Sequence, residues 1–110
     1  MNTEFREHMI DLLKTIASPA MQMEYENNVP IANVPAELVC QWFDDFHPET
    51  ELFKSSFSSG ELNELSKFTE FYDARVKAIP DDGGVTKLQT NKEWLEVQSY
   101  ANELVSKNGW

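Results

Sequence analysis

Apolar residues recur every three or four positions along most of this chain, which places them on one face of an α-helix. Four segments carry this pattern, with apolar stripes at Phe5–Ile16, Leu38–Phe46, Leu62–Ile79 and Trp94–Val105. Signals of a β-strand are otherwise absent, although Val85–Leu88 could be a short extended piece. We therefore expect residues 1–110 to form a single all-α domain, a bundle of four main helices with an additional short helix.

Proline residues mark the ends of the first two helices. Asn2 or Thr3 can cap the first helix, and Ser18-Pro19 ends or kinks it, with residues 20–26 resuming it for a turn or two. Residues 27–35 predict an extended connector, because a residue that precedes proline avoids the α region. His47-Pro48 stops the second helix, which begins at Pro35.

Capping signals mark the last two main helices. Ser58 and Glu61 form one capping box and Thr90 with Glu93 forms a second, so a helix is expected to follow each. The first of these helices is expected to run to Ile79, before Pro80. Asn108-Gly109 is a typical C-terminal stop, and a left-handed Gly109 would let Trp110 fold back on Val105.

The negative charge of the chain is concentrated in one window. Between Lys14 and Lys54 there is no Lys or Arg, yet the window contributes −7 of the formal net charge of −10. Its carboxylates are Glu24, Glu26, Glu37, Asp44, Asp45, Glu49 and Glu51. A soluble helix usually mixes both signs of charge, so this segment is either a solvated face or a docking surface for a basic partner.

Composition excludes several classes of protein. The single cysteine, Cys40, excludes an internal disulfide, and we expect it to be a buried structural thiol. The N-terminal segment carries acids where a signal peptide needs bases, and no apolar run approaches the length of a membrane span. The net charge disfavours binding to nucleic acid or to anionic membranes. The default expectation is a cytoplasmic protein.

No arrangement of residues indicates catalysis, a cofactor or a metal. His8 and His47 are far apart in sequence, and the carboxylates around His47 lack a recognised ligand spacing, so a metal site there is only a minor alternative. Cys40 has no basic neighbour in sequence that would lower the pKa of its thiol. Asp44 and Asp45 point about 100° apart on a helix and do not face each other. We expect a protein that is not an enzyme.

The best candidates for partner binding lie at the end of the second helix and in the short helix expected from Pro48 to about Lys54. We predict that Asp44, Asp45, Glu49 and Glu51 face the partner, with His47 beside them. Glu49 and Glu51 are expected in the first turn of the short helix. Trp42 and Trp94 lie on apolar faces and predict core positions, whereas Trp110 is either a helix-capping contact or a further partner-binding anchor.

Residues 40–80 resemble a known kind of protein. They contain F-D-D-F-H-P, then a Phe ahead of the capped helix E-L-N-E-L-S-K-F, then Pro80, and W-L-E-V-Q-S-Y-A-N-E-L follows in the last helix. This combination resembles the small acidic helical immunity proteins of bacterial contact-dependent inhibition and related polymorphic toxin systems. The resemblance implies an all-α immunity protein that neutralises one toxin, often a nuclease, and it transfers no binding residue.

The sequence therefore predicts an immunity protein that binds a cognate basic toxin domain and occludes its active site. A nuclease must be cationic where it holds phosphates, and carboxylates could take the place of those phosphates. One alternative is a nucleic-acid-mimicking inhibitor of a DNA-binding enzyme, which would compete for several such proteins. Another is a helical adaptor or regulatory module, whose partner would not need the acidic residues.

Overall fold

The computed structural model describes residues 3–110 and is helical throughout, with no strand in this range. The elements are α1 (Thr3–Ala17), α2 (Pro19–Asn28), α3 (Val34–Asp45), α4 (Glu51–Ser56), α5 (Ser59–Asp73), the 3₁₀-helix η1 (Val76–Ala78), α6 (Gly84–Leu88) and α7 (Lys92–Asn108). The all-α prediction is confirmed. The predicted count of four main helices and one short helix is too low, because residues 19–28 and 84–88 also form helices. The predicted cap Asn2 lies outside the described residues.

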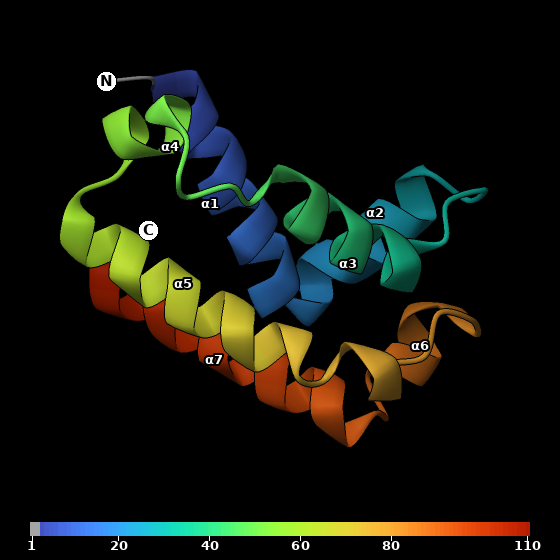
Figure 1. Ribbon diagram of the computed structural model, residues 1–110. Coiled ribbons are helices and arrows are strands. Elements are labelled where there is room, and N and C mark those ends of the chain that lie inside the picture. Colours follow the sequence, from blue (N-terminus) through green and yellow to red (C-terminus); the bar gives the residue numbers. More distant parts are fainter. Residues whose placement is uncertain (1–2) are drawn as a thin grey trace.

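The helices form two groups that pack across a common core (Figure 1). α5 and α7 lie side by side, and α1 packs against α7 while also contacting α2, α3 and α4. The first turns of α1 and the C-terminus lie at one end of the molecule, and the α2–α3 connection lies at the other. α1 therefore links α7 to α2, α3 and α4.

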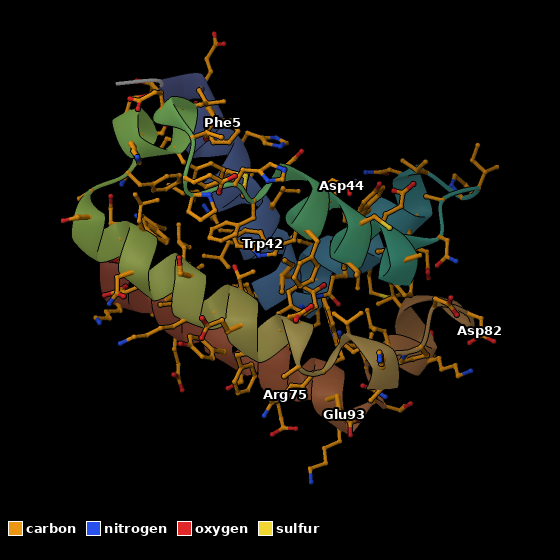
Figure 2. The ribbon with its side chains drawn as sticks, in the orientation of Figure 1. Phe5, Trp42, Asp44, Arg75, Asp82 and Glu93 are labelled. Carbon is orange, nitrogen blue, oxygen red and sulfur yellow. The ribbon has the colours of Figure 1, made fainter. Side chains whose placement is uncertain are left out.

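Aromatic side chains fill the core between the two groups. Trp42 and Trp94 are fully buried, as predicted for both. The Trp42 ring meets the edge of Phe68 at a centroid distance of 5.3 Å, and its indole N–H donates to the Thr69 hydroxyl oxygen at 3.0 Å. This bond satisfies the polar group of a residue that is otherwise surrounded by apolar atoms. Figure 2 shows Trp42 in the interior and Asp44 on the outer side of α3.

Of the two helix starts predicted from capping boxes, one is confirmed and the other is shifted by one residue. The Ser58–Glu61 capping box is present in both directions and confirms the start of α5. α7 instead begins one residue later than predicted, because the Asn91 side chain accepts from the Trp94 N–H at 2.8 Å. The Thr90 hydroxyl is engaged elsewhere and donates to the Lys87 carbonyl oxygen at 2.7 Å.

α5 ends at Asp73 rather than at the predicted Ile79. The Arg75 guanidinium lies over the Phe71 ring, 3.4 Å from its centroid, and donates to the Phe71 carbonyl oxygen at 3.1 Å. The backbone then tightens into η1, where the Ala78 N–H donates to the Arg75 carbonyl oxygen at 3.0 Å. This tighter turn still places Ile79 in the core.

Residues 85–88 form part of α6, a single helical turn rather than an extended piece. Val85 and Leu88 are both fully buried and lie three residues apart, as one helical face requires. The N-terminus of the turn is held by α2, since the Glu26 carboxylate accepts from the Val85 N–H at 2.9 Å. This contact spans 59 residues, so local sequence patterns could not reveal it.

A buried glutamine network joins α1, α2, the C-cap of α6 and α7. Gln22 is fully buried, and its amide nitrogen donates to the carbonyl oxygens of Thr15 and Ile16, each at 3.0 Å. Its amide oxygen accepts from Gln89 at 2.6 Å, and Gln98 accepts from both other glutamines. Because Pro19 has no N–H to continue α1, Gln22 supplies donors to the carbonyls at the end of that helix.

Candidate functional site

A hollow of about 280 Å³ lies where α3 ends and α4 begins, against the first turn of α1. We call it the acidic hollow. It is lined by Phe5, Asp44, Asp45, His47, Thr50, Leu52 and Phe53. The structure therefore brings together three of the predicted partner-binding residues, Asp44, Asp45 and His47.

Local helix signals shape the turn that borders the hollow. α3 stops at Asp45, and the Thr50 side chain caps α4 by accepting from the Phe53 N–H at 3.4 Å. Glu51 is in the first turn of α4, as predicted. Glu49 was predicted there too, but it lies in the turn before the helix because Thr50 is the N-cap. Both carboxylates are exposed, next in sequence to lining residues.

Two histidines contact the residues around the acidic hollow. His8 of α1 lies with its Nε2 2.8 Å from the Asp45 Oδ2, although 37 residues separate the two in sequence. His47 Nε2 lies 2.7 Å from the Asp44 carbonyl oxygen, which requires a proton on that nitrogen. His47 Nδ1 is 3.9 Å from the Glu49 carboxylate. These contacts connect α1, the end of α3 and the following turn.

The floor of the hollow is aromatic. The Phe5 ring meets Phe53 edge-on at a centroid distance of 4.9 Å, and Phe46 packs against the same Phe53 ring at 5.2 Å. Phe53 is 1% exposed and belongs to the core, whereas Leu52 at the rim is 41% exposed. The site thus combines a rigid apolar floor with an anionic edge.

No Lys or Arg in the described residues 3–110 forms an ion pair with a carboxylate of the acidic window. The four Lys or Arg ion pairs are Arg6–Glu61, Arg75–Glu96, Lys87–Asp82 and Lys107–Glu64. All four engage carboxylates outside residues 15–53. Folding therefore leaves the acidic window without cationic partners from elsewhere in the described chain.

α1 adds carboxylates that the sequence analysis missed. Glu4, His8 and Asp11 are all exposed and share one face of α1 by their helical spacing. His8 contacts Asp45, so this face adjoins the acidic hollow. Arg6 and Lys14 in the same helix masked the signal in sequence, because they break the run of acids. A projection of α1 as a helical wheel would have separated Arg6 from that face.

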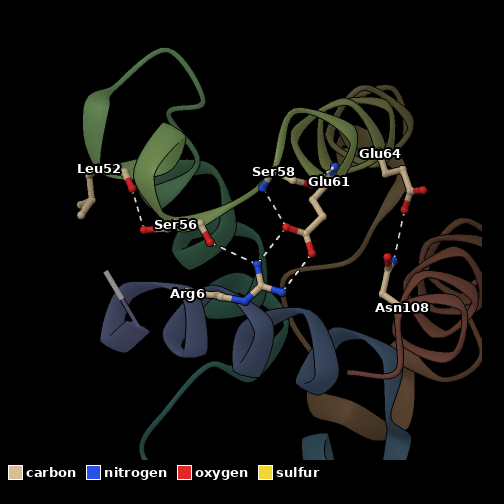
Figure 3. A network of polar contacts seen from close by, with 7 residues as sticks. All are labelled: Arg6, Leu52, Ser56, Ser58, Glu61, Glu64 and Asn108. Carbon is tan, nitrogen blue, oxygen red and sulfur yellow. Dashed lines mark hydrogen bonds and ion pairs between the residues drawn. The ribbon is translucent and has the colours of Figure 1, made fainter. Parts of the chain in front are cut away.

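Arg6 takes part in a second polar network, with Glu61 and the backbone of Ser56 (Figure 3). Its guanidinium binds Glu61 through two hydrogen bonds of 2.9 Å and also donates to the Ser56 carbonyl oxygen at 3.1 Å. Glu61 in turn accepts from the Ser58 N–H at 2.8 Å. The hydrogen bond from Arg6, aided by the Ser58 N–H, holds the pKa of Glu61 below its usual value, and Glu61 raises the pKa of Arg6.

Trp110 belongs to this second network rather than to the acidic hollow. Gly109 adopts the left-handed conformation (φ 68°), and the Trp110 N–H donates to the Val105 carbonyl oxygen at 2.9 Å. The Trp110 ring lies 6.4 Å from the Phe57 ring and 5.9 Å from the Arg6 guanidinium carbon. The predicted capping contact of Trp110 is therefore present, and the ring does not line the hollow.

The other carboxylates of the acidic window are dispersed. Glu26 caps α6, and Glu37 accepts a hydrogen bond from the Tyr25 hydroxyl. Glu24 is exposed on α2. The window is thus one continuous stretch in sequence but several sites in space, and the end of α3 with the α3–α4 turn holds its densest group.

Cys40 is exposed, which contradicts the predicted buried thiol. The apolar stripe of α3 passes through Leu38 and Trp42, so Cys40 faces outward between them. It lies at a groove of about 370 Å³ together with Val39, Val76 and Lys77. The Tyr72 hydroxyl is buried without a hydrogen-bond partner, and burial raises the pKa of Tyr72.

Comparisons of the chain with protein-family models, with curated proteins and with solved structures found no match. Among residues 3–110, no cluster of three or more His, Cys, Asp or Glu side chains is suited to a metal ion. None of the described helices has the length and apolar character of a bilayer span. The acidic hollow and its charge are therefore the features from which a function can be inferred.

Proposed function

We propose that this chain is an immunity protein that acts in the cytoplasm without enzymatic activity and binds a cognate basic toxin domain through the acidic hollow. One observation carries the proposal. Carboxylates gather around an aromatic floor, and no Lys or Arg of the described chain pairs with those of the acidic window. A partner with arginine or lysine side chains would supply the missing positive charge.

The position of Asp44 and Asp45 supports this inference. Both lie in the last turn of α3, where the helix dipole is negative and no basic residue is present. A carboxylate there costs about 0.3–1 kcal/mol of stability, so the arrangement is unfavourable for the isolated protein. A cation from a partner would offset this unfavourable interaction and so favour binding.

The proposed mechanism is occlusion rather than chemistry. A nuclease domain presents cations where it holds the phosphates of its substrate, and the carboxylates of the acidic hollow would occupy those cations. The exposed Leu52 and the aromatic floor would receive an apolar side chain of the toxin. Long-range attraction would raise the association rate constant towards about 10⁸ M⁻¹s⁻¹ at low salt, against about 10⁵–10⁶ M⁻¹s⁻¹ without steering.

The test measures binding to the basic C-terminal domain of the protein encoded beside this chain's gene. Neutralising Asp44→Asn, Asp45→Asn, Glu49→Gln and Glu51→Gln together should lower the association rate constant about tenfold or more at low salt. The same variant should flatten the dependence of that rate on salt.

The control variant changes the same amount of charge on the other side of the molecule. It carries Glu70→Gln, Asp73→Asn, Glu93→Gln and Glu103→Gln, in α5 and α7. Its association rate should stay within about threefold of the original. Absence of binding to the basic domain, or an equal loss in both variants, would contradict the proposal. Competition for several unrelated DNA-binding proteins would identify a nucleic-acid mimic instead.

A further inference from the structure

The connection between α2 and α3 carries the most exposed large apolar side chain among the described residues. Ile31 is 97% exposed, and its neighbour Val29 is 40% exposed. The α2–α3 connection that contains both lies at the end of the molecule away from the first turns of α1 and the C-terminus (Figure 1). Single exposed apolar residues are common, but almost complete exposure of isoleucine leaves its whole side chain in contact with water.

Hydrogen bonds fix the backbone that presents Ile31. The Val29 N–H donates to the Tyr25 carbonyl oxygen at 2.9 Å, and the Ala32 N–H donates to the Val29 carbonyl oxygen at 2.9 Å. Asn33 caps α3 through its side-chain oxygen, and its amide nitrogen donates to the Asp81 carbonyl oxygen at 2.6 Å. Ile31 therefore projects from a defined turn, and little ordering of the backbone is needed for it to bind a partner.

Polar residues lie along one side of α3 between this turn and the acidic hollow. Glu37, Gln41 and Asp45 follow one another at intervals of four residues along α3, so they share one side of the helix. The twelve residues of α3 span about 18 Å, and Ile31 and the hollow lie beyond its two ends, in a molecule whose longest extent is 38 Å. A toxin domain that contacts both must therefore lie along the length of α3, over an interface larger than the ordinary one of about 800 Å² per partner.

We propose that Ile31 is an apolar anchor that inserts into a pocket beside the cationic groove of the same basic toxin domain. This inference rests on the proposed function. Charge favours a basic toxin domain as the partner of Ile31. A formal net charge of −10 repels the two other candidates, an anionic membrane and a second copy of the chain. The acidic hollow would set the encounter rate, and Ile31 would set the lifetime of the complex.

The experiment compares Ile31→Ser with Leu95→Ser in binding to the same encoded basic domain, measured by surface plasmon resonance. Leu95 of α7 is 40% exposed and receives the same chemical change away from the proposed interface. Ile31→Ser should raise Kd about tenfold or more through faster dissociation, with the association rate and its salt dependence unchanged. Leu95→Ser should change Kd less than about twofold.

The outcomes separate the two proposals. If the Kd of Ile31→Ser stays within about twofold of the original while the four-carboxylate variant associates more slowly, the proposal that Ile31 is an anchor is wrong and the proposed function stands. If Ile31→Ser weakens binding but neutralising the carboxylates does not, the proposed role of the acidic hollow in binding is wrong and the proposed anchor role of Ile31 stands.

A photoreactive residue at position 31 provides an independent readout in the native cells. It should cross-link to the encoded basic protein, whereas the same residue at position 95 should not. A cross-link to a second copy of the chain, or to lipid, would overturn the proposed anchor. Failure to cross-link any protein would overturn it as well.

Discussion

Individual polar side chains determine how consecutive helices of this chain are connected. Gln22 is the clearest example, because it compensates a backbone defect that a nearby proline creates. Its amide contacts Thr15, Ile16, Gln89 and Gln98, which bring donors and acceptors from three other helices or their ends. A buried amide with this many partners specifies one arrangement of the surrounding helices, since each partner would otherwise be left unsatisfied.

Replacing Gln22 with leucine should lower the free energy of unfolding by about 2–3 kcal/mol, because buried carbonyl and amide groups lose their partners. Urea denaturation followed by circular dichroism measures the change. Gln41→Leu is the matched control, since the Gln41 amide makes one long contact, 3.4 Å to the Tyr25 hydroxyl oxygen. An equal loss in both variants would mean that the Gln22 network adds no particular stability.

Some helix ends in this fold can be predicted from local sequence patterns, and others cannot. The capping box at Ser58 and the left-handed Gly109 are local features, and both predictions are confirmed. α6 is different, because its first turn depends on the Glu26 carboxylate of α2. Gly84 makes this approach possible: its φ is 67°, and a Cβ there would lie 2.7 Å from a Glu26 oxygen.

Gly84→Ala should therefore destabilise the protein by about 1–3 kcal/mol, through backbone strain and displacement of Glu26. Gly60→Ala is a control with the opposite expected sign. Gly60 lies in α5, and an added Cβ would meet nothing closer than 4.0 Å, so alanine should stabilise by up to about 1 kcal/mol. Melting temperatures of the two variants test the difference. Similar shifts in one direction would contradict this account of Gly84.

At the scale of the whole molecule, Arg6 matters both through its charge and through its position. Arg6 joins α1 to the end of α4 and the start of α5 and lies beside Trp110, so one side chain ties four segments together. The bidentate geometry with Glu61 makes this pair stronger than an ordinary surface ion pair. The same placement removes a cation from the neighbourhood of the acidic hollow.

The Arg6–Glu61 pair predicts how stability depends on pH. The folded-state pKa of Glu61 lies below the ordinary value of 4.5, so its contribution is fully present above that pH and is lost as pH falls through the folded-state pKa. Glu61→Gln should cost about 1–2 kcal/mol at pH 7, and the difference should shrink below about pH 4. Chemical denaturation at several pH values measures it. Glu70→Gln, at an exposed position in α5, should show no such trend.

Periodicity and capping signals predicted the all-α class, the main helices and the core positions of Trp42 and Trp94, because these depend on neighbours a few residues apart. The grouping of the acidic residues was predictable only in part. Asp44, Asp45 and His47 share one helix end and so come together, whereas Trp110 lies with Arg6 and Phe57. His8 meets Asp45 only because helices that are distant in sequence pack at particular angles, whereas Cys40 faces solvent because it lies off the apolar stripe through Leu38 and Trp42. Those angles follow from the shapes of the buried side chains, which spacing along the chain does not encode.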